Sequence, residues 1–295
     1  MLKEFFKVDL KKYGSNTKKY VYRPASLNYP KDEAVMFITE GFIDKKDVFR
    51  KCRNCLIFWP DSIPVPQDIL ERHVVVRCSN PHVRYCEFYR ENHITYLPEK
   101  EEVSFIGGAW ISPKAAIGEN VKIFPGAYIG GEVTIGNDVY IGSGVRLVGN
   151  IFIGDGTIIR ENSVIGADGL STDRDASGKA VTMPQFGGGI IEKNVQIGAN
   201  VTIGRGAIDN TVIHAGCKID NHCFISHNVE LGEDTFVVGE TIMFGSSSTG
   251  KQVYISGNAT IRNGIHIGDR ALIGMGAVVV KNVSADSTVK GNPAR

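Results

Sequence analysis

Aliphatic residues recur every six positions through most of the chain, and this period constrains the fold more than any other feature. They run from Ile117 to Ile165, from Ile191 to Ile203, and from Ile213 to Val279, where Met243 and Thr249 are the exceptions. Because alternate residues of a strand face the same side, each aliphatic residue and the residue two before it point inward. The period is shorter than the strand spacing of roughly 8–12 residues that is typical of a β-sandwich.

Glycine and asparagine follow many of these aliphatic residues and mark corners between strands. Strings such as IGEN, IGND and IGAN place them where a positive φ angle is needed. Six residues then form one short strand and one corner, and three such units close a triangular coil. Stacked coils lie about 4.8 Å apart. We therefore predict a mainly β fold in which residues 106–295 form a parallel β-helix of about eight coils.

Residues 1–105 lack the period and predict a separate small α/β domain. All but Gly14 and Gly41 of the 34 glycines lie after residue 105. The apolar strings EAVMFIT, CLIFWP and HVVVRC alternate with charged stretches that have helical potential. Such a domain would also cover the exposed end of the β-helix. Within the repeats, the polar, glycine-rich segment 167–189 is either a tolerated surface insertion or a loop that reaches toward a ligand.

Composition excludes several classes of partner. The 33 basic and 32 acidic residues give a formal charge of +1, so we expect neither nucleic acid nor an anionic membrane as a partner. No apolar run is long enough for a membrane span, and the first residues lack the apolar core of a signal peptide. The six cysteines indicate reduced thiols in a cytoplasmic protein. The C-x-x-C string of Cys52 and Cys55 is interpreted as two small core residues.

Three histidines, His214, His222 and His227, lie close together in HAGCKIDNHCFISHNV. His227 stands two residues after Ile225, which is a corner position, so burial in the core does not explain it. An imidazole that titrates near neutral pH can act as a general base when a polar neighbour orients it. The neighbours expected to do so are Asp220, Asn221 and Asn228.

Gly245 follows His227 at an interval of one full coil and in unbroken phase. We therefore predict that it lies directly over His227, one strand spacing away. A glycine leaves its backbone N–H unshielded, so that this group can donate to a developing oxyanion. A base and an oxyanion donor at one corner suit attack by an amine or a hydroxyl on a thioester.

The segment from Ile165 to Gly245 resembles the UDP-3-O-acylglucosamine N-acyltransferases of lipid A biosynthesis. The matching strings are VIGADG, MPQFG, VQIGANVTIGRGAIDNTVI and KIDNHCFISHNVELGEDT. The resemblance implies that His227 is the catalytic base, that Gly245 is the oxyanion donor, and that the β-helix is left-handed. It also implies a homotrimer with active sites between adjacent subunits. The residues expected to bind substrate are Phe37, Gln185, Asp220, Asn221 and His222.

Both ends of the chain depart from that family. The first 105 residues resemble its uridine-binding domain, but Phe37, Glu40 and Ile43 replace the Phe-x-x-Asn-x-x-Tyr pattern of its nucleobase pocket. The closing string IGMGAVVVKNVSADSTVKGNPAR resembles acetyl-CoA-dependent hexapeptide acyltransferases. That resemblance makes Lys281 and Arg295 the candidates for contacts with the phosphates of coenzyme A.

These observations predict an N-acyltransferase that moves an acyl group from an acyl-CoA to a nucleotide-linked amino sugar, with segment 167–189 closing over the sugar nucleotide. The product would enter surface polysaccharide or lipopolysaccharide biosynthesis. The alternatives are a lipid A-type N-acyltransferase that uses acyl carrier protein, an O-acyltransferase and a non-catalytic solenoid. A further alternative is a γ-class carbonic anhydrase, whose H-x-x-x-x-H spacing His222 and His227 share; its third histidine is missing, so no metal is expected.

Overall fold

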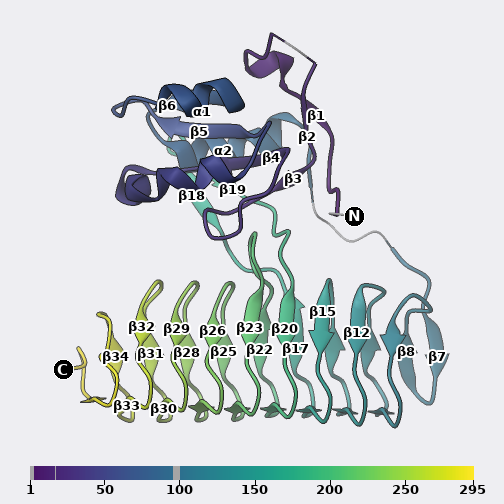
Figure 1. Ribbon diagram of the computed structural model, residues 1–295. Helices are drawn as coiled ribbons and strands as arrows, with labels where there is room; N and C mark the ends of the chain where they lie inside the picture. The colour runs from purple at the N-terminus through teal and green to yellow at the C-terminus, as the bar shows by residue number, and fades with distance from the viewer. Residues whose placement is uncertain (1–2, 17, 96–99) are drawn as a thin grey trace. The chain divides into compact units, whose positions relative to one another are not determined.

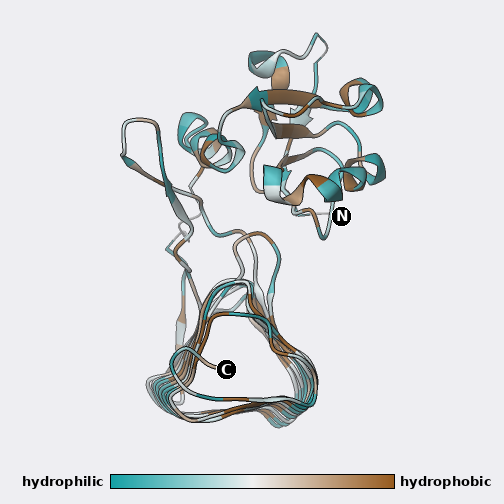
Figure 2. Ribbon diagram, turned by 90° about the vertical axis from the view of Figure 1, so that its left-hand side faces the viewer, coloured by the Kyte–Doolittle hydropathy of each residue, from teal (hydrophilic) through white to brown (hydrophobic). Residues whose placement is uncertain are grey.

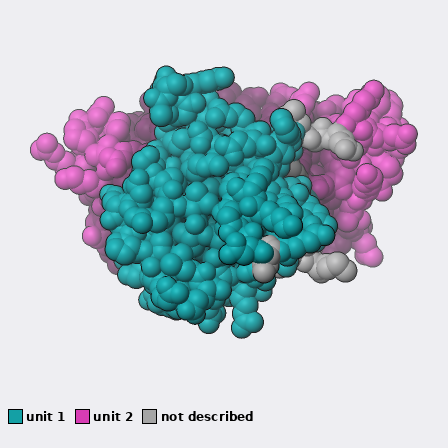
Figure 3. Space-filling model, turned by 90° about the horizontal axis from the view of Figure 1, so that it is seen from above, with its two compact units in different colours: residues 1–97, 170–186 teal, residues 98–169, 187–295 magenta. Residues whose placement is uncertain are grey.

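The computed structural model describes residues 3–16, 18–95 and 100–295, which form two compact units (Figures 1 and 3). The first unit comprises residues 1–97 and 170–186, and the second comprises residues 98–169 and 187–295. The boundary therefore precedes the expected one at 105/106. The reason is that β7 (Ser104–Ile106) pairs antiparallel with β8 (Ala109–Ile111) and so joins a sheet of the second unit.

The first unit is built on a parallel four-stranded sheet, as the predicted α/β domain requires. The strands in spatial order are β3 (Arg23–Pro24), β4 (Ala34–Phe37), β5 (Leu56–Pro60) and β6 (Val74–Cys78). The helices are η1 (Leu10–Tyr13), η2 (Glu40–Lys51), α1 (Gln67–Arg72) and α2 (Pro81–Glu91), and β1 (Val8–Asp9) pairs with β2 (Tyr20–Val21). Strand β5 is fully buried, as its unbroken apolar sequence indicates.

The middle of the insertion folds with this first unit. It forms a hairpin of β18 (Thr172–Arg174) and β19 (Ala180–Thr182). Asp173 pairs with His82 at 3.0 Å, and the ring of Phe186 packs against Tyr89 with a centroid separation of 5.2 Å. The segment is therefore an anchored part of the unit and not a free surface insertion.

The second unit is a parallel β-helix of three sheets, which Figure 2 shows end-on as a triangle, and its buried core consists of aliphatic residues such as Ile141, Ile203 and Ile261. Sheet 1 contains, after β7 and β8, the strands β11 (Tyr128–Ile129), β14 (Arg146–Leu147), β17 (Val164–Ala167), β22 (Thr202–Gly204), β25 (Phe224–Ile225), β28 (Ile242–Met243), β31 (Thr260–Ile261) and β34 (Val278–Val279). Sheet 2 contains β9 (Ala116–Ile117), β12 (Val133–Ile135), β15 (Ile151–Ile153), β20 (Gly189–Ile191), β23 (Thr211–Ile213), β26 (Glu230–Leu231), β29 (Ser248–Thr249) and β32 (His266–Ile267). Sheet 3 contains β10 (Lys122–Ile123), β13 (Tyr140–Ile141), β16 (Ile158–Ile159), β21 (Gln196–Ile197), β24 (Lys218–Ile219), β27 (Phe236–Val237), β30 (Tyr254–Ile255), β33 (Leu272–Ile273) and β35 (Thr288–Val289).

The register of the β-helix is the one that the period predicts. Ile225 pairs with Ile203 on one side and with Met243 on the other, and Met243 pairs in turn with Ile261. The β-helix is longer than the repeat indicated, because Ile111 of β8 already pairs with Ile129. Beyond β34 it continues through β35, after a shorter step that breaks the period of six.

Among the helices of the part of the chain that the structure describes, none is both long and apolar enough to cross a membrane. All six cysteines are free thiols, and five of them are buried.

Candidate active site

His227 lies at the corner between β25 and β26, where its side chain is half-buried. Its Nδ1 atom is 3.1 Å from Asn228 Oδ1. Two further bonds fix the amide of Asn228: Oδ1 accepts the N–H of Ala207 at 3.0 Å, and Nδ2 donates to the carbonyl of Asp209 at 2.9 Å. Because the oxygen of the amide faces the imidazole, Nδ1 carries the proton and Nε2 keeps its lone pair. The imidazole is thus held in the form that accepts a proton at Nε2.

The irregular step in the repeat builds the socket that holds Asn228. Four extra residues between Ile203 and Ile213 form a loop, and Ala207 and Asp209 are part of it. The backbone N–H of Asn228 also donates to Thr211 Oγ1 at 2.9 Å, at the end of that loop. The departure from the period therefore orients the side chain that fixes the histidine tautomer.

Gly245 occupies the same corner one coil further on, as the register predicts. A Cβ atom on Gly245 would lie 2.5 Å from His227 Cε1 and 2.6 Å from Nε2, so no larger residue fits beside the imidazole. Among the described residues the Gly245 N–H has no hydrogen-bond acceptor, whereas the corner amides of Asn137 and Lys251 donate to aspartate side chains. The Gly245 N–H is therefore available to a substrate oxygen.

A second glycine covers the other end of the imidazole. A Cβ atom on Gly169 would lie 2.7 Å from His227 Cδ2. The preceding Asp168 pairs with Arg205 at 2.6 Å, and the guanidinium-bearing side chain of Arg205 is only 3% exposed. The backbone N–H of Arg205 donates to the carbonyl of Ala167 at 2.9 Å. These contacts fix the segment that carries Gly169 against the histidine.

The sequence analysis did not identify Asp168, Gly169 or Arg205 as parts of the site. One sequence signal for them is the string GADG, which directly follows an unbroken run of repeats. In the structure the strand at this point contains a bulge between Ile165 and Ala167. Another signal is Arg205, which lies between two glycines just after β22. A charged side chain that is buried at such a place requires a partner of opposite charge.

Asp220, Asn221 and His222 lie at the preceding corner, between β24 and β25, and are exposed. The prediction that Asp220 and Asn221 orient His227 is wrong. Asp220 accepts the N–H groups of Asn221 and Gly239, and Asn221 accepts the N–H of Ala199. Their side chains close turns of their own corner, and Asn228 is the neighbour that contacts His227. A role for the three residues in binding substrate stays a prediction.

Two hollows lie on the outer face of sheet 3 and not beside His227. The larger has a volume of about 740 Å³, and Lys218, Phe236 and Tyr254 are among its lining residues. The smaller, of about 390 Å³, shares these three residues and also contains Asp220 and Asn221. We locate the candidate chemistry at His227, because this corner brings a base and a backbone N–H without an acceptor among the described residues onto neighbouring coils.

Phe37 ends strand β4 in the first unit. Its ring packs against Tyr85 with a centroid separation of 4.8 Å and against His82 with one of 5.3 Å. The hydrogen bond from His82 lowers the pKa of Asp173, which is on the hairpin of the same unit. Phe37 thus lies at the carboxyl ends of a parallel sheet, where ligands of α/β domains commonly bind.

Gln185 is 2% exposed and belongs to the first unit. Its Nε2 donates to the carbonyl of Met183 at 3.2 Å, but its Oε1 atom has no hydrogen-bond partner within the described residues. A buried carbonyl oxygen without a donor is costly, so it is suited to accept a hydrogen bond from a ligand.

Lys281 shares its corner with His227 and Gly245. The pairings of β25, β28, β31 and β34 place it three coils beyond His227, about 14 Å along the β-helix. Arg295 is exposed, and its backbone N–H donates to the carbonyl of Lys290. The equivalent corner positions therefore form a row along the β-helix. This row runs from the imidazole of His227 to the ammonium group of Lys281.

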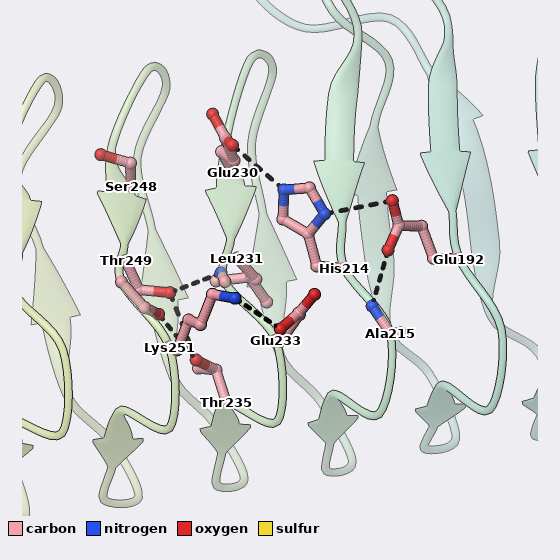
Figure 4. A network of polar contacts seen from close by, with 12 residues as sticks. Glu192, His214, Ala215, Glu230, Leu231, Glu233, Thr235, Ser248, Thr249 and Lys251 are labelled. Carbon is pink, nitrogen blue, oxygen red and sulfur yellow. Dashed lines mark hydrogen bonds and ion pairs between the residues drawn. The ribbon is translucent and has the colours of Figure 1, made fainter.

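His214 is separate from His227 and lies after β23, between two carboxylates (Figure 4). Its Nδ1 is 3.2 Å from Glu192, and its Nε2 is 3.1 Å from Glu230. Burial lowers the pKa of His214, but the hydrogen bonds to Glu230 and Glu192 outweigh it, so the pKa is raised overall. This arrangement occupies both ring nitrogens with ion pairs and points to a role in stability.

We expect the His214→Gln variant to lose stability in a pH-dependent way. Because the folded-state pKa is raised, the ion pairs stabilise the protein fully below the unfolded pKa, and the gain is lost as the pH rises through the folded pKa. For partly exposed pairs the loss should be about 0.5–1 kcal/mol at acidic pH and less at alkaline pH. Thermal unfolding at both pH values measures it, with His222→Gln as the control. An equal loss at both pH values would contradict this assignment.

Comparison with known proteins agrees with this architecture. A family model described as "Bacterial transferase hexapeptide (six repeats)" matches residues 114–149. Another, "Hexapeptide repeat of succinyl-transferase", matches residues 190–221 and 250–281. Among solved structures, the UDP-N-acetylglucosamine acyltransferase of Bacteroides fragilis is 25% identical, with a TM-score of 0.58 over 65% of this chain and 73% of that one. The one from Acinetobacter baumannii is 24% identical, with a TM-score of 0.59 over 64% and 72%. The chain is thus a hexapeptide-repeat β-helix protein.

More particularly, the chain resembles UDP-3-O-acylglucosamine N-acyltransferases. The one from Helicobacter hepaticus is 38% identical over 131 residues, which are 44% of this chain and 40% of the relative. The one from Coxiella burnetii is 41% identical over 117 residues, which are 39% of this chain and 34% of the relative. The matched region spans about two fifths of the length of these curated relatives or less.

Proposed function

We propose that this protein transfers an acyl group from a thioester to the amino group of a nucleotide-linked amino sugar. The observation that carries the proposal is the corner at which His227 Nε2, with its lone pair, lies beside Gly245, whose N–H has no acceptor within the described part of the chain. A base and an oxyanion donor on neighbouring coils are the two groups that acyl transfer needs. The resemblance to UDP-3-O-acylglucosamine N-acyltransferases supports the same chemistry.

These two groups account for the proton and the negative charge that the reaction moves. The amine nitrogen attacks the thioester carbonyl carbon, so that a C–N bond forms and the C–S bond breaks. His227 Nε2 accepts the proton that the amine loses and returns it to the departing thiolate, which gives an amide and a free thiol. While the carbonyl oxygen carries negative charge, the Gly245 N–H donates to it. Asn228 stabilises the imidazolium that forms, since its oxygen accepts a hydrogen bond from the Nδ1–H group.

The names of the curated relatives favour a UDP-linked acylglucosamine as the acceptor. They therefore support the lipid A-type N-acyltransferase, the alternative of the sequence analysis, better than its main prediction of an acyl-CoA-dependent enzyme. We propose the edge of the first unit at Phe37 and Gln185 as the nucleotide-binding region. The corner from His227 to Lys281 is proposed to hold the donor, whose pantetheine arm is common to coenzyme A and acyl carrier protein. A homotrimer stays a proposal that rests on the family resemblance.

The test presents the protein with UDP-3-O-acylglucosamine and with one acyl group on two carriers, acyl carrier protein and coenzyme A. We expect the acceptor to raise the unfolding temperature, since a ligand at 100 times its Kd stabilises by about 2.7 kcal/mol. We expect mass spectrometry to detect an amide with the carrier protein. A product with acyl-CoA only would assign coenzyme A as donor. If hydroxylamine releases the newly transferred acyl group, which an isotope label distinguishes from the ester already present in the acceptor, the product would indicate O-acyl transfer. Absence of both stabilisation and product would contradict the proposal.

A further inference from the structure

A second cluster of reactive side chains lies in the first unit, apart from the transfer chemistry. Cys52, Cys55 and His73 each offer a ligand atom, and these atoms all lie within 4.8 Å of one another. Their residues are 1%, 0% and 5% exposed. Among the described residues this is the one group of three or more His, Cys, Asp or Glu side chains with this geometry. The sequence analysis interpreted the two cysteines as core residues because their C-x-x-C string has no convincing partner pair in the sequence.

The imidazole of His73 is oriented as a metal ligand is. Its Nε2 lies 2.9 Å from the carbonyl of Phe49, an acceptor, so Nε2 carries the ring proton. Nδ1 therefore keeps its lone pair, and it accepts only a long bond of 3.2 Å from the backbone N–H of Cys55. A metal-binding histidine characteristically donates its other N–H to a carbonyl in this way, which fixes the tautomer and the ring.

The two thiols come from one tight turn. Cys52 directly follows η2 and Cys55 directly precedes β5, and Asn54 between them has a φ angle of 56°, in the left-handed region. The turn also holds a carboxylate nearby, because the N–H of Arg53 donates to Asp32 Oδ1 at 2.9 Å. Asp32 is exposed and does not belong to the cluster, so a water molecule can fill the fourth ligand position from this side.

From this geometry we propose that Cys52, Cys55 and His73 bind one zinc ion. Thiolate sulfur and imidazole nitrogen are the ligands that zinc prefers, whereas magnesium and calcium prefer oxygen. Two buried thiolates without a cation are costly, and a divalent ion balances both charges. Zinc binding replaces the long bond from Cys55 to the imidazole and displaces the protons of both thiols.

The location indicates a structural ion. Cys55 precedes β5, His73 precedes β6 and Asp32 precedes β4, so that all three lie at the amino ends of parallel strands. Ligands of open α/β sheets bind at the opposite, carboxyl ends. The zinc ion therefore ties together the beginnings of β5 and β6 and stabilises the first unit, and it takes no part in acyl transfer.

The test measures zinc in the full-length protein, purified without chelating reagents from cells supplied with zinc. We expect one zinc ion per chain, and cobalt reconstitution should give the charge-transfer absorption of cobalt thiolates. The Cys52→Ser and His73→Gln variants should lose the ion, whereas Cys86→Ser keeps it, although Cys86 is also buried in this unit. Removal of zinc from the wild-type protein should lower its unfolding temperature.

Zinc release from the wild-type protein upon thiol modification gives a second measurement, which does not require a variant that folds. Protein without zinc that does not take up zinc or cobalt would overturn the proposal. So would a disulfide between Cys52 and Cys55 in the purified protein, or an ion retained by both variants. None of these outcomes depends on acyl transfer, so the zinc site and the proposed function fail separately.

Discussion

The His227→Ala variant should lose about 10²–10⁴-fold in kcat, the range that a positioned general base contributes. The structure gives the physical reason: the imidazole is held between two glycines, and its tautomer leaves Nε2 as the acceptor of a proton. Because the imidazole acts on the proton and not on the bound substrates, KM should change little. Steady-state rates with the donor and acceptor of the proposed function measure both constants.

His222→Ala is the matched control for this experiment. His222 is also a corner histidine with a positive φ angle of 61°, but it lies at another corner and is exposed. We expect its kcat to stay near the wild-type value, whereas a role of His222 in binding substrate would raise KM. The Asn228→Ala variant should lower kcat by a smaller factor than His227→Ala, because the histidine would remain but its tautomer would no longer be fixed. Retention of most of kcat in His227→Ala would remove the histidine from the mechanism.

The architecture of the second unit and the pairing of His227 with Gly245 could be predicted from the period. In a β-helix the contacts between coils are a fixed interval apart, so a local pattern determines long-range neighbours. The pairing of Ile225 with Met243 confirms this interval. Sequence proximity within one coil was misleading, however, because strand β25 separates the corner of Asp220 and Asn221 from the corner of His227.

The rest of the site could not be predicted because it is built where the period fails. The socket of Asn228 is formed by the irregular loop that contains Asp209, and Gly169 belongs to the start of the insertion. No repeat interval specifies these contacts. The same applies to His73, which meets the C-x-x-C turn only because β5 and β6 pair in parallel.

The Gly245→Ala variant is the second change from which we expect a large loss. The added methyl carbon would lie 2.5 Å from Cε1 and 2.6 Å from Nε2 of His227, closer than such atoms approach. The ring is held on its other side by Gly169, whose own Cβ position is 2.7 Å from Cδ2, so it has little room to move away. The added carbon must therefore move either the imidazole away from the attacking amine or the N–H of residue 245 away from the oxyanion. Loss of one oxyanion donor costs about 10²–10³-fold in kcat.

A matched alanine at another corner separates this effect from a general loss of stability. In Gly257→Ala the added carbon lies 3.2 Å from the carbonyl oxygen of Gly239 and touches no histidine. This variant should keep its activity, and Gly245→Ala should still unfold cooperatively, so that its larger loss of kcat is measured on folded protein. If Gly245→Ala stayed fully active, the oxyanion would have to be stabilised by a group other than the N–H of residue 245. A loss in Gly245→Ala that His227→Ala does not deepen would show that the two residues act as one unit, because effects on a shared step are not additive.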